Sequence, residues 1–167
     1  MSGDRAVFLD RDGTLIDDVG YISDAEDVRL VPGAADALRA LRTAGIRLVV
    51  VSNQSGLGRA LITQEQADAV HQRFVEELER AGAEIDAAYY CPHAPEERCD
   101  CRKPLPGLLI DAARELELDL ERSFMVGNSD VDVAAGEAAG CRTILLADGL
   151  DWPEAVRRIR SWSRQAA

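Results

Sequence analysis

The sequence predicts an α/β protein built on a doubly wound, mainly parallel sheet. Two observations favour this class: short apolar runs recur along the chain, and a segment of helical length separates each run from the next. Such alternation is typical of a parallel sheet with helices on both faces. We expect residues 1–167 to form a single domain, since a chain of this length can bury one sizeable core.

The first half of the chain is expected to hold two strands and two helices. Residues 5–9 form a short apolar strand, which a Gly-Thr turn ends. A Pro-Gly pair opens a helix at 32–44, and the glycine that follows is typical of a helix end. Residues 46–51 are β-branched and apolar enough for a central strand. A Thr-x-x-Gln capping box then begins a long amphipathic helix at about 63–82.

The second half continues the alternation. Val156, Ile159 and Trp162 have the spacing of an apolar stripe, which predicts a C-terminal helix that packs on the core. The expected elements are, in order, a strand at 85–90, a helix at 106–118, a strand at 124–126, a short helix at 131–139, a strand at 143–146 and a helix at about 153–165.

Composition and charge exclude several classes of function. The net charge of −11 argues against a nucleic-acid surface, because phosphate backbones are bound by basic patches. No apolar run approaches the length of a membrane span, and the N-terminus lacks the basic and apolar regions of a signal peptide. We therefore expect a soluble, cytoplasmic protein without a membrane partner. A small anionic substrate remains compatible with a local cationic pocket.

Polar side chains follow four of the expected strands at the point where each strand ends. In parallel sheets of this class, ligands bind beyond the carboxyl ends of the strands. The residues at these ends are Asp10 and Asp12, Ser52, Cys91, and the pair at 127–128. The sequence therefore predicts one functional site at this edge of the sheet.

Asp10 and Asp12 are two carboxylates separated by one residue. Carboxylates this close repel each other unless a cation lies between them or one is protonated. With a divalent metal, one carboxylate can attack a phosphorus atom while the other transfers protons. A solvated acidic turn is the alternative interpretation of the pair taken alone.

Two further segments could bind an anion. Residues 52–59 are rich in small residues and glycine, so main-chain N–H groups could approach a phosphate closely. A plain Asn/Gly-rich turn is the alternative. Arg102 and Lys103 form an adjacent cationic pair, and Lys103 is the only lysine among nineteen Lys and Arg residues. Lysine offers a compact point charge and arginine a fork for phosphate or sugar oxygens. The alternative is an ordinary basic pair on the protein surface.

Cys91, His93, Cys99 and Cys101 fall within eleven residues of a Pro-bounded loop. Three thiolates and an imidazole suit tetrahedral Zn²⁺ in a closed site, which predicts a structural metal. Disulfides and free loop cysteines are the alternatives, but nothing in the sequence suggests secretion. Cys141 lies apart and is interpreted as a small buried hydrophobe.

The segment 127–132 supplies further oxygen ligands after the fourth strand. Mg²⁺ binds a few protein oxygens and keeps several waters, and both carboxylate and amide oxygens can serve. A helix follows this segment, so a role as N-cap is the alternative for Asp130.

Together these motifs resemble those of the haloacid dehalogenase (HAD) superfamily of phosphatases, over nearly the whole chain. The superfamily pattern is Asp-x-Asp-Gly-Thr, then Ser or Thr, then Lys, then a late acidic motif. The matching positions here are Asp10 and Asp12, Ser52, Lys103 and 128–132. The resemblance implies a HAD-like Rossmannoid sheet with a structural zinc loop at 91–101. No insertion is long enough for a separate cap domain.

The resemblance also implies a role for each residue. Asp10 would attack phosphorus to form an aspartyl-phosphate, and Asp12 would protonate the leaving oxygen and then activate water. Ser52 and Lys103 would hold the transferring phosphoryl group. Mg²⁺ would bind the Asp10 carboxylate, the Asp12 carbonyl and the Asn128 side chain. The residues that would contact substrate are Arg11, Asp18, Val19, Gly20, Tyr21, Ser52, Asn53, Gln54, Ser55, Arg102, Lys103 and Ser129.

Three features resemble one branch of the superfamily, which holds the D-glycero-D-manno-heptose 1,7-bisphosphate 7-phosphatases and the histidinol-phosphate phosphatases. These features are the run 10–14, the run 53–56, and the zinc loop that continues into 101–104. Gly20-Tyr21 and the run 53–56 favour the heptose enzymes, whereas the five-residue gap inside the zinc loop also occurs in the histidinol-phosphate group. The resemblance thus implies a Mg²⁺-dependent phosphatase that removes the C7 phosphate of heptose 1,7-bisphosphate.

Two positions depart from the pattern. Asn128 stands where the family usually has Asp, and Ser129 where it often has Lys or Arg. Asn brings one negative charge less, so we expect a lower affinity for Mg²⁺. A catalytically weak module that binds a phosphorylated ligand is therefore the alternative from another class. In either case we expect a monomer with a small phosphorylated partner.

Overall fold

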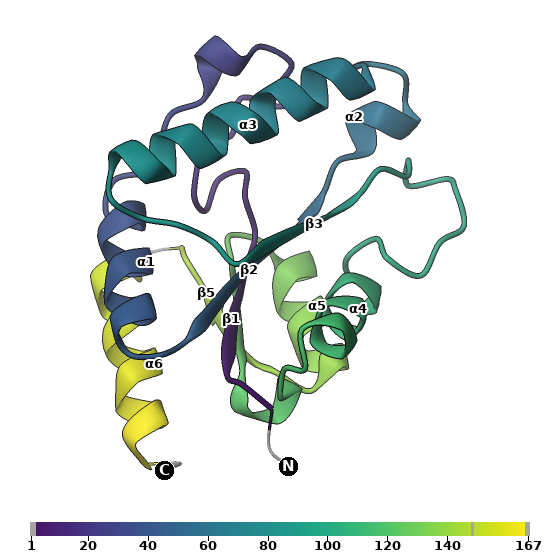
Figure 1. Ribbon diagram of the computed structural model, residues 1–167. Coiled ribbons are helices and arrows are strands. Elements are labelled where there is room, and N and C mark those ends of the chain that lie inside the picture. Colours follow the sequence, from purple (N-terminus) through teal and green to yellow (C-terminus); the bar gives the residue numbers. More distant parts are fainter. Residues whose placement is uncertain (1–2, 148, 166–167) are drawn as a thin grey trace.

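The computed structural model describes residues 3–147 and 149–165. Five parallel strands form one sheet in the order β3-β2-β1-β4-β5, with β1 in the centre (Figure 1). The strands are β1 (Ala6–Leu9), β2 (Arg47–Asn53), β3 (Ala87–Cys91), β4 (Phe124–Gly127) and β5 (Arg142–Leu145). This architecture confirms the predicted fold class.

The sheet register brings segments far apart in the sequence into contact. Val7 of β1 pairs with Leu48 on one side and with Phe124 on the other. Because all strands run in the same direction, the carboxyl ends of β1, β2, β3 and β4 meet at one edge of the sheet. The first and last thirds of the chain therefore contribute to the same surface.

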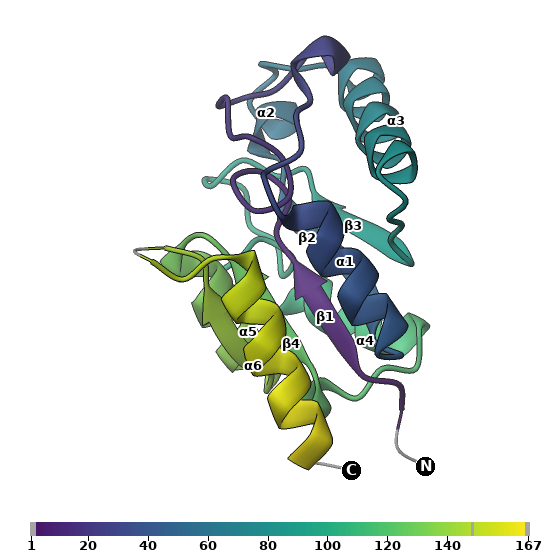
Figure 2. The same ribbon diagram turned by 90° about the vertical axis from the view of Figure 1, so that its left-hand side faces the viewer.

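Helices cover both faces of the sheet (Figures 1 and 2). One face packs against α1, α3 and α6, and the other packs against α4 and α5. Alternate β1 residues serve the two faces, so Val7 and Leu9 belong to the first core and Ala6 and Phe8 to the second. The helices are α1 (Ala34–Thr43), α2 (Ser55–Gly58), α3 (Gln64–Arg80), α4 (Gly107–Glu115), α5 (Asp130–Ala139) and α6 (Trp152–Gln165).

Local interactions explain where the elements begin and end. Thr63 and Gln66 form the expected capping box at the start of α3. The Asp86 carboxylate accepts the Leu48 N–H at 2.7 Å in place of a main-chain carbonyl, and β3 begins one residue later at Ala87. Helix α4 ends earlier than predicted, because Glu117 adopts a left-handed conformation with φ of 55°.

Three short elements were not predicted from the sequence. They are α2 and two 3₁₀ helices, at Ala25–Asp27 and Leu120–Arg122. Segments this short carry too few residues for a periodic pattern. Among the described residues, no helix is long and apolar enough to cross a membrane.

Candidate active site

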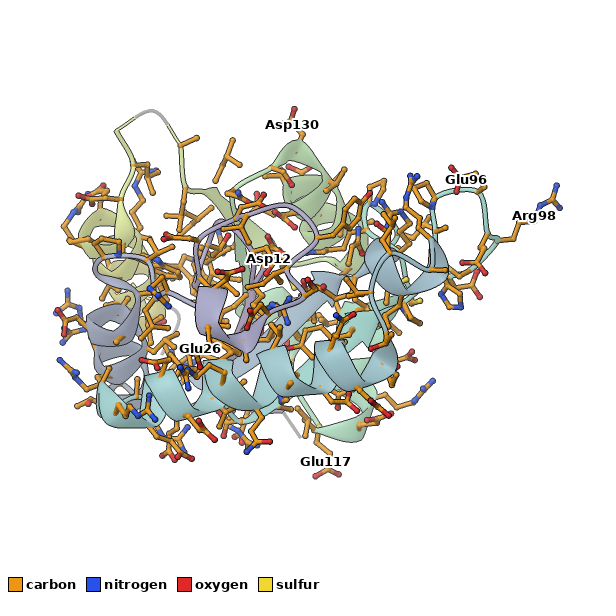
Figure 3. All side chains as sticks on the ribbon, turned by 90° about the horizontal axis from the view of Figure 1, so that it is seen from above. Asp12, Glu26, Glu96, Arg98, Glu117 and Asp130 are labelled. Atoms are coloured by element: carbon orange, nitrogen blue, oxygen red, sulfur yellow. The ribbon has the colours of Figure 1, made fainter. Side chains whose placement is uncertain are left out.

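A cavity of about 360 Å³ opens at the carboxyl ends of the strands. Figure 3 looks down on this end of the molecule, with Asp12 near the centre and Glu96 and Arg98 on the outlying cysteine loop. The side chains around the cavity come from the end of β2, from the segments after β1, β2 and β4, and from the loop before α4. They are Asp10, Asp12, Asp18, Gly20, Tyr21, Ser52, Asn53, Gln54, Ser55, Gly56, Ile62, Lys103, Asn128, Ser129, Val131 and Asp132.

Asp10 lies at the floor of this cavity. Its main-chain N–H donates to the Val126 carbonyl, which continues the sheet by one residue beyond β1. One carboxylate oxygen accepts a hydrogen bond from Lys103 Nζ at 2.8 Å. Burial raises the pKa of Asp10 to about 6, and the nearby Asp132 charge adds to this effect while Lys103 opposes it.

Lys103 is almost completely buried, with 2% of its surface exposed. Its ammonium group donates to Asp10 at 2.8 Å, to Asp132 at 2.6 Å and to the Val51 carbonyl at 2.8 Å. Burial opposes the charged form, but the two carboxylates outweigh it and raise the pKa of Lys103. The ammonium is therefore a permanently charged group beside Asp10.

Sequence reasoning did not single out Asp132, although the site contains it. One oxygen binds Lys103, and the other accepts the Asn128 N–H, the Ser129 N–H and the Ser129 hydroxyl at 3.1, 3.2 and 2.9 Å. Asp132 thus closes the capping box of α5 and holds the lysine. The box spacing from Ser129 was the available signal. A Cβ at Gly127 would lie 2.3 Å from this carboxylate, so glycine is required there.

Asp12 is held on both of its carboxylate oxygens. Arg11 Nε donates to one oxygen at 2.8 Å, and Gln54 Nε2 donates to the other at 3.1 Å. The same Gln54 amide donates to Ser52 Oγ at 2.9 Å. Gln54 therefore joins Asp12, which follows β1, and Ser52, near the end of β2, into one hydrogen-bonded group.

Asn53 fixes the position of the lysine loop. Its amide nitrogen donates to the Lys103 carbonyl at 3.0 Å, and its amide oxygen accepts the Lys103 N–H at 3.0 Å. This paired hydrogen bond anchors residue 103 to the end of β2. Asn53 lines the cavity as well, so one side chain can both anchor the loop and face a ligand.

The oxygen donors on the cavity floor fit a hard divalent cation. Asp10 contributes a carboxylate and Asn128 an amide side chain, and no main-chain N–H in the described part of the chain donates to the Asp12 carbonyl. Gly13 packs against the Asn128 amide so closely that a Cβ there would lie 2.1 Å from Nδ2. A few protein oxygens with open positions for water suit Mg²⁺.

The cysteine loop brings its four predicted ligands together. The ligand atoms of Cys91, His93, Cys99 and Cys101 all lie within 4.8 Å of one another. The Sγ atoms of Cys91 and Cys99 are 3.8 Å apart, and His93 Nδ1 lies 3.4 Å from Cys91 Sγ and 3.3 Å from Cys101 Sγ. Tetrahedral Zn²⁺ with Zn–S bonds of about 2.3 Å requires sulfur atoms about 3.8 Å apart. The cluster fits zinc, and Cys141 lies outside it.

The predicted substrate contacts divide into two groups. Most of them line the cavity, but Arg11, Val19 and Arg102 do not. The Arg11 side chain is 3% exposed and turns back to Asp12. Val19 is exposed at the rim, and Arg102 donates to the His93 carbonyl at 3.4 Å. Ser129 lines the cavity, yet its hydroxyl already donates to Asp132.

Two family models match the chain. The model described as haloacid dehalogenase-like hydrolase matches residues 7–91, and a second model, described as HAD-hydrolase-like, matches residues 100–166. Together they match the segments that supply the cavity residues, while residues 92–99 of the cysteine loop lie between the two matches.

Curated relatives and solved structures show the same likeness. The chain is 40% identical to the D-glycero-beta-D-manno-heptose-1,7-bisphosphate 7-phosphatase of Yersinia pestis, over 84% of this chain and 79% of the relative. It is also 40% identical to the enzyme of that name from Helicobacter pylori (strain ATCC 700392 / 26695), over 87% of this chain and 85% of the relative. The D,D-heptose 1,7-bisphosphate phosphatase of B. bronchiseptica, solved with magnesium and phosphate, superposes with a TM-score of 0.85 at 31% identity. The superposition covers 98% of this chain and 99% of that chain.

Proposed function

The chain belongs to the haloacid dehalogenase-like hydrolase family, and from this premise we propose that it hydrolyses the C7 phosphate of D-glycero-D-manno-heptose 1,7-bisphosphate. The observation that carries the proposal is the meeting of Asp10, Asp12 and Lys103 in one cavity. The names of the curated relatives support the choice of substrate.

Asp10 is the proposed nucleophile. Its carboxylate attacks phosphorus, an oxygen–phosphorus bond forms, and the bond between phosphorus and the sugar oxygen breaks. Lys103 and Ser52 stabilise the charge on the phosphoryl oxygens, since both lie on the cavity wall. Lys103 also fixes the orientation of Asp10 through their hydrogen bond.

Asp12 is the proposed acid and base. It gives a proton to the departing sugar oxygen, and it then takes a proton from the water that attacks the aspartyl-phosphate. Inorganic phosphate leaves and Asp10 is restored. Gln54 and Arg11 hold Asp12 during both steps.

Mg²⁺ is the proposed catalytic ion and Zn²⁺ the proposed structural ion. Asp10, the Asp12 carbonyl and Asn128 would hold Mg²⁺, which would neutralise negative charge on the phosphoryl group. Cys91, His93, Cys99 and Cys101 would hold Zn²⁺. Replacing Asn128→Asp adds a carboxylate, so calorimetric titration should give a magnesium affinity higher by about tenfold. An unchanged affinity would exclude Asn128 from the ligands.

A substrate panel tests the proposed function. Phosphate release should require Mg²⁺, should vanish in Asp10→Asn, and should show the highest kcat/KM for heptose 1,7-bisphosphate. The short gap between His93 and Cys99 favours histidinol phosphate as the second candidate. A preference of orders of magnitude for histidinol phosphate would replace the heptose assignment. Binding without turnover would indicate a phospho-ligand binding module.

We extend the proposal to the domain organisation, the oligomeric state and the location of the protein. The described elements would act as one domain and as a monomer in the cytoplasm, where the four unpaired cysteines of the described chain could stay reduced. Light scattering during size-exclusion chromatography tests the monomer, since a molar mass well above 18.1 kDa would contradict it.

A further inference from the structure

We propose that Tyr90 and His71 are positioning residues for the acid–base carboxylate of Asp12, and that they act through the buried side chain of Arg11. This inference rests on the proposed function, because it assigns a role within the same reaction. Neither Tyr90 nor His71 lines the catalytic cavity. They belong to β3 and α3, two elements that supply neither the nucleophile nor the lysine.

The chain of contacts begins at Asp12. Arg11 Nε donates to Asp12 Oδ1 at 2.8 Å, and Arg11 Nη2 lies 3.4 Å from Oδ2. The Arg11 side chain is 3% exposed, whereas that of Asp12 is 20% exposed. The fork therefore approaches Asp12 from inside the protein and leaves the cavity side of the carboxylate open to a ligand.

Tyr90 determines where the Arg11 guanidinium lies. The guanidinium carbon is 5.2 Å from the centre of the Tyr90 ring, a distance at which the ring attracts a cation. Burial lowers the pKa of Arg11, but the charge of Asp12 opposes burial, and the net change is upward. Arg11 therefore keeps its charge although water hardly reaches it.

His71 in turn fixes the Tyr90 ring. His71 Nδ1 lies 2.7 Å from the Tyr90 hydroxyl oxygen, and the two rings meet edge to face with centroids 5.4 Å apart. Burial, followed by the charge of Arg11, lowers the pKa of His71, while Asp68 opposes this. Burial raises the pKa of Tyr90, against the charge of Arg11. A neutral imidazole and a protonated tyrosine thus share this hydrogen bond.

The placement of Arg11 matters because proton transfer depends on the direction in which the Asp12 carboxylate points. Protonating an alkoxide leaving group requires that direction to be correct, whereas a nitrophenolate leaves with little need for a proton. A fault in Arg11 placement should therefore slow the hydrolysis of alkyl phosphates more than that of aryl phosphates. It should lower kcat rather than raise KM, since no contact with substrate is removed.

Tyr90→Phe tests the inference, because it removes the hydroxyl and keeps the ring. We expect kcat/KM for the sugar bisphosphate to fall about tenfold through kcat, a fraction of what a general acid contributes. For p-nitrophenyl phosphate we expect a change below about twofold. His71→Leu should have the same effect, and the double variant should be no slower than either single variant. Arg11→Lys keeps the charge but lacks the planar fork, so its kcat/KM for the sugar bisphosphate should fall further than that of Tyr90→Phe.

Tyr89→Phe is the matched control. Tyr89 is the neighbouring residue on the other face of the sheet, and its hydroxyl donates to Glu115 at 2.8 Å outside the cavity. This variant should keep full activity on both substrates. Equal losses on both substrates in Tyr90→Phe, a change in KM alone, or additive effects of Tyr90→Phe and His71→Leu would overturn the inference.

A measurement without turnover separates this inference from the proposed function. The Nε–H proton of Arg11 should exchange slowly with water in the wild type and faster in Tyr90→Phe, as followed by NMR. If the wild type releases no phosphate from either substrate, the proposed function fails, whatever the exchange rate. Unchanged exchange in Tyr90→Phe would overturn the positioning role, whether or not the enzyme is active.

Discussion

The Asp10 carboxylate lies where ionisation costs free energy. Burial raises its pKa from 3.8 to about 6 despite the hydrogen bond from Lys103. A divalent cation on the cavity floor would offset this cost, because it would add positive charge beside the carboxylate. The residue that performs the proposed attack is thus also a source of instability in the metal-free protein.

The Asp10→Asn variant should show this cost as a function of pH. Between about pH 4 and pH 6 the folded wild type keeps a proton on Asp10 that the unfolded chain has lost, so its stability falls as the pH rises. Asn cannot ionise. In EDTA, the free energy of unfolding of the variant minus that of the wild type should rise by on the order of 2 kcal/mol from pH 4 to pH 7, as measured by chemical denaturation.

The pH-dependent part of this difference is the informative quantity. Loss of one Lys103 hydrogen bond adds an offset that does not change over this range, since Lys103 stays charged. Adding Mg²⁺ should stabilise the wild type and narrow the gap at pH 7. A gap of the same size at every pH would show that ionisation of Asp10 costs the fold nothing.

Helix α5 packs on β4 and β5 without room for a side chain at Gly136. A Cβ there would lie 2.6 Å from Met125 Cβ and 2.8 Å from Thr143 Cγ2. This close approach sets the height of the helix above the sheet. It therefore influences where the first turn of α5 presents Asp132 to Lys103.

Gly136→Ala should destabilise the protein, although alanine is the better helix former. Helix propensity alone would give a gain of about 1 kcal/mol. Overpacking against β4 and β5 should instead cost about 1–3 kcal/mol in the free energy of unfolding, measured with urea. Ala138→Gly is the control at an exposed position of the same helix, and it should cost about 1 kcal/mol through propensity. A stabilised Gly136→Ala would mean that the helix can move away from the sheet.

The loop between β3 and α4 has little apolar content to hold it, and it carries the lysine. A structural ion would fix the loop and, through it, the position of Lys103. The Asn53 amide pair holds the same segment from the end of β2. With the ion bound, two independent anchors would determine where the ammonium group lies.

Cys99→Ser should remove zinc and lower the melting temperature. The purified wild type should contain about one zinc per chain, since four ligands form one closed tetrahedral site. Cys141→Ala is the control, because Cys141 is buried outside the cluster. Metal analysis should find zinc retained in this control. Zinc absent from the wild type, or retained in Cys99→Ser, would contradict the site.

On the scale of the whole molecule, one sheet carries both cores and the site. The order β3-β2-β1-β4-β5 places the central strand beside β2 and β4, whose ends supply Ser52 and Asn128. The described chain has no second sheet over this edge. Loops and the short helix α2 therefore shape the cavity mouth, which suits a small substrate.

The protein should unfold as one cooperative unit. Trp152 and Trp162 both lie on α6, so their fluorescence reports the packing of α6 on the sheet, while far-UV circular dichroism reports all helices. The two urea transitions should coincide if the chain is a single domain. A fluorescence transition that precedes the loss of helicity would show that α6 separates from the rest first.

The sequence alone predicted the fold class, the grouping of the four cysteine-loop residues and the polar residues at the strand ends. These are local signals: apolar runs, turn residues and spacing within one segment. Parallel strands then imply that their carboxyl ends meet at one edge, whatever the strand order. The placement of Asp10, Asp12 and Ser52 around one cavity follows from this rule.

Only the tertiary structure decided which side chains act on one another across the sheet. Asp132 holds Lys103, Asn53 anchors the lysine loop, and Arg11 turns inward to Asp12. Each contact except the last joins residues at least 29 positions apart, and the Arg11 guanidinium lies against the Tyr90 ring from β3. Burial, strand order and register set these contacts, and no spacing along the chain encodes them.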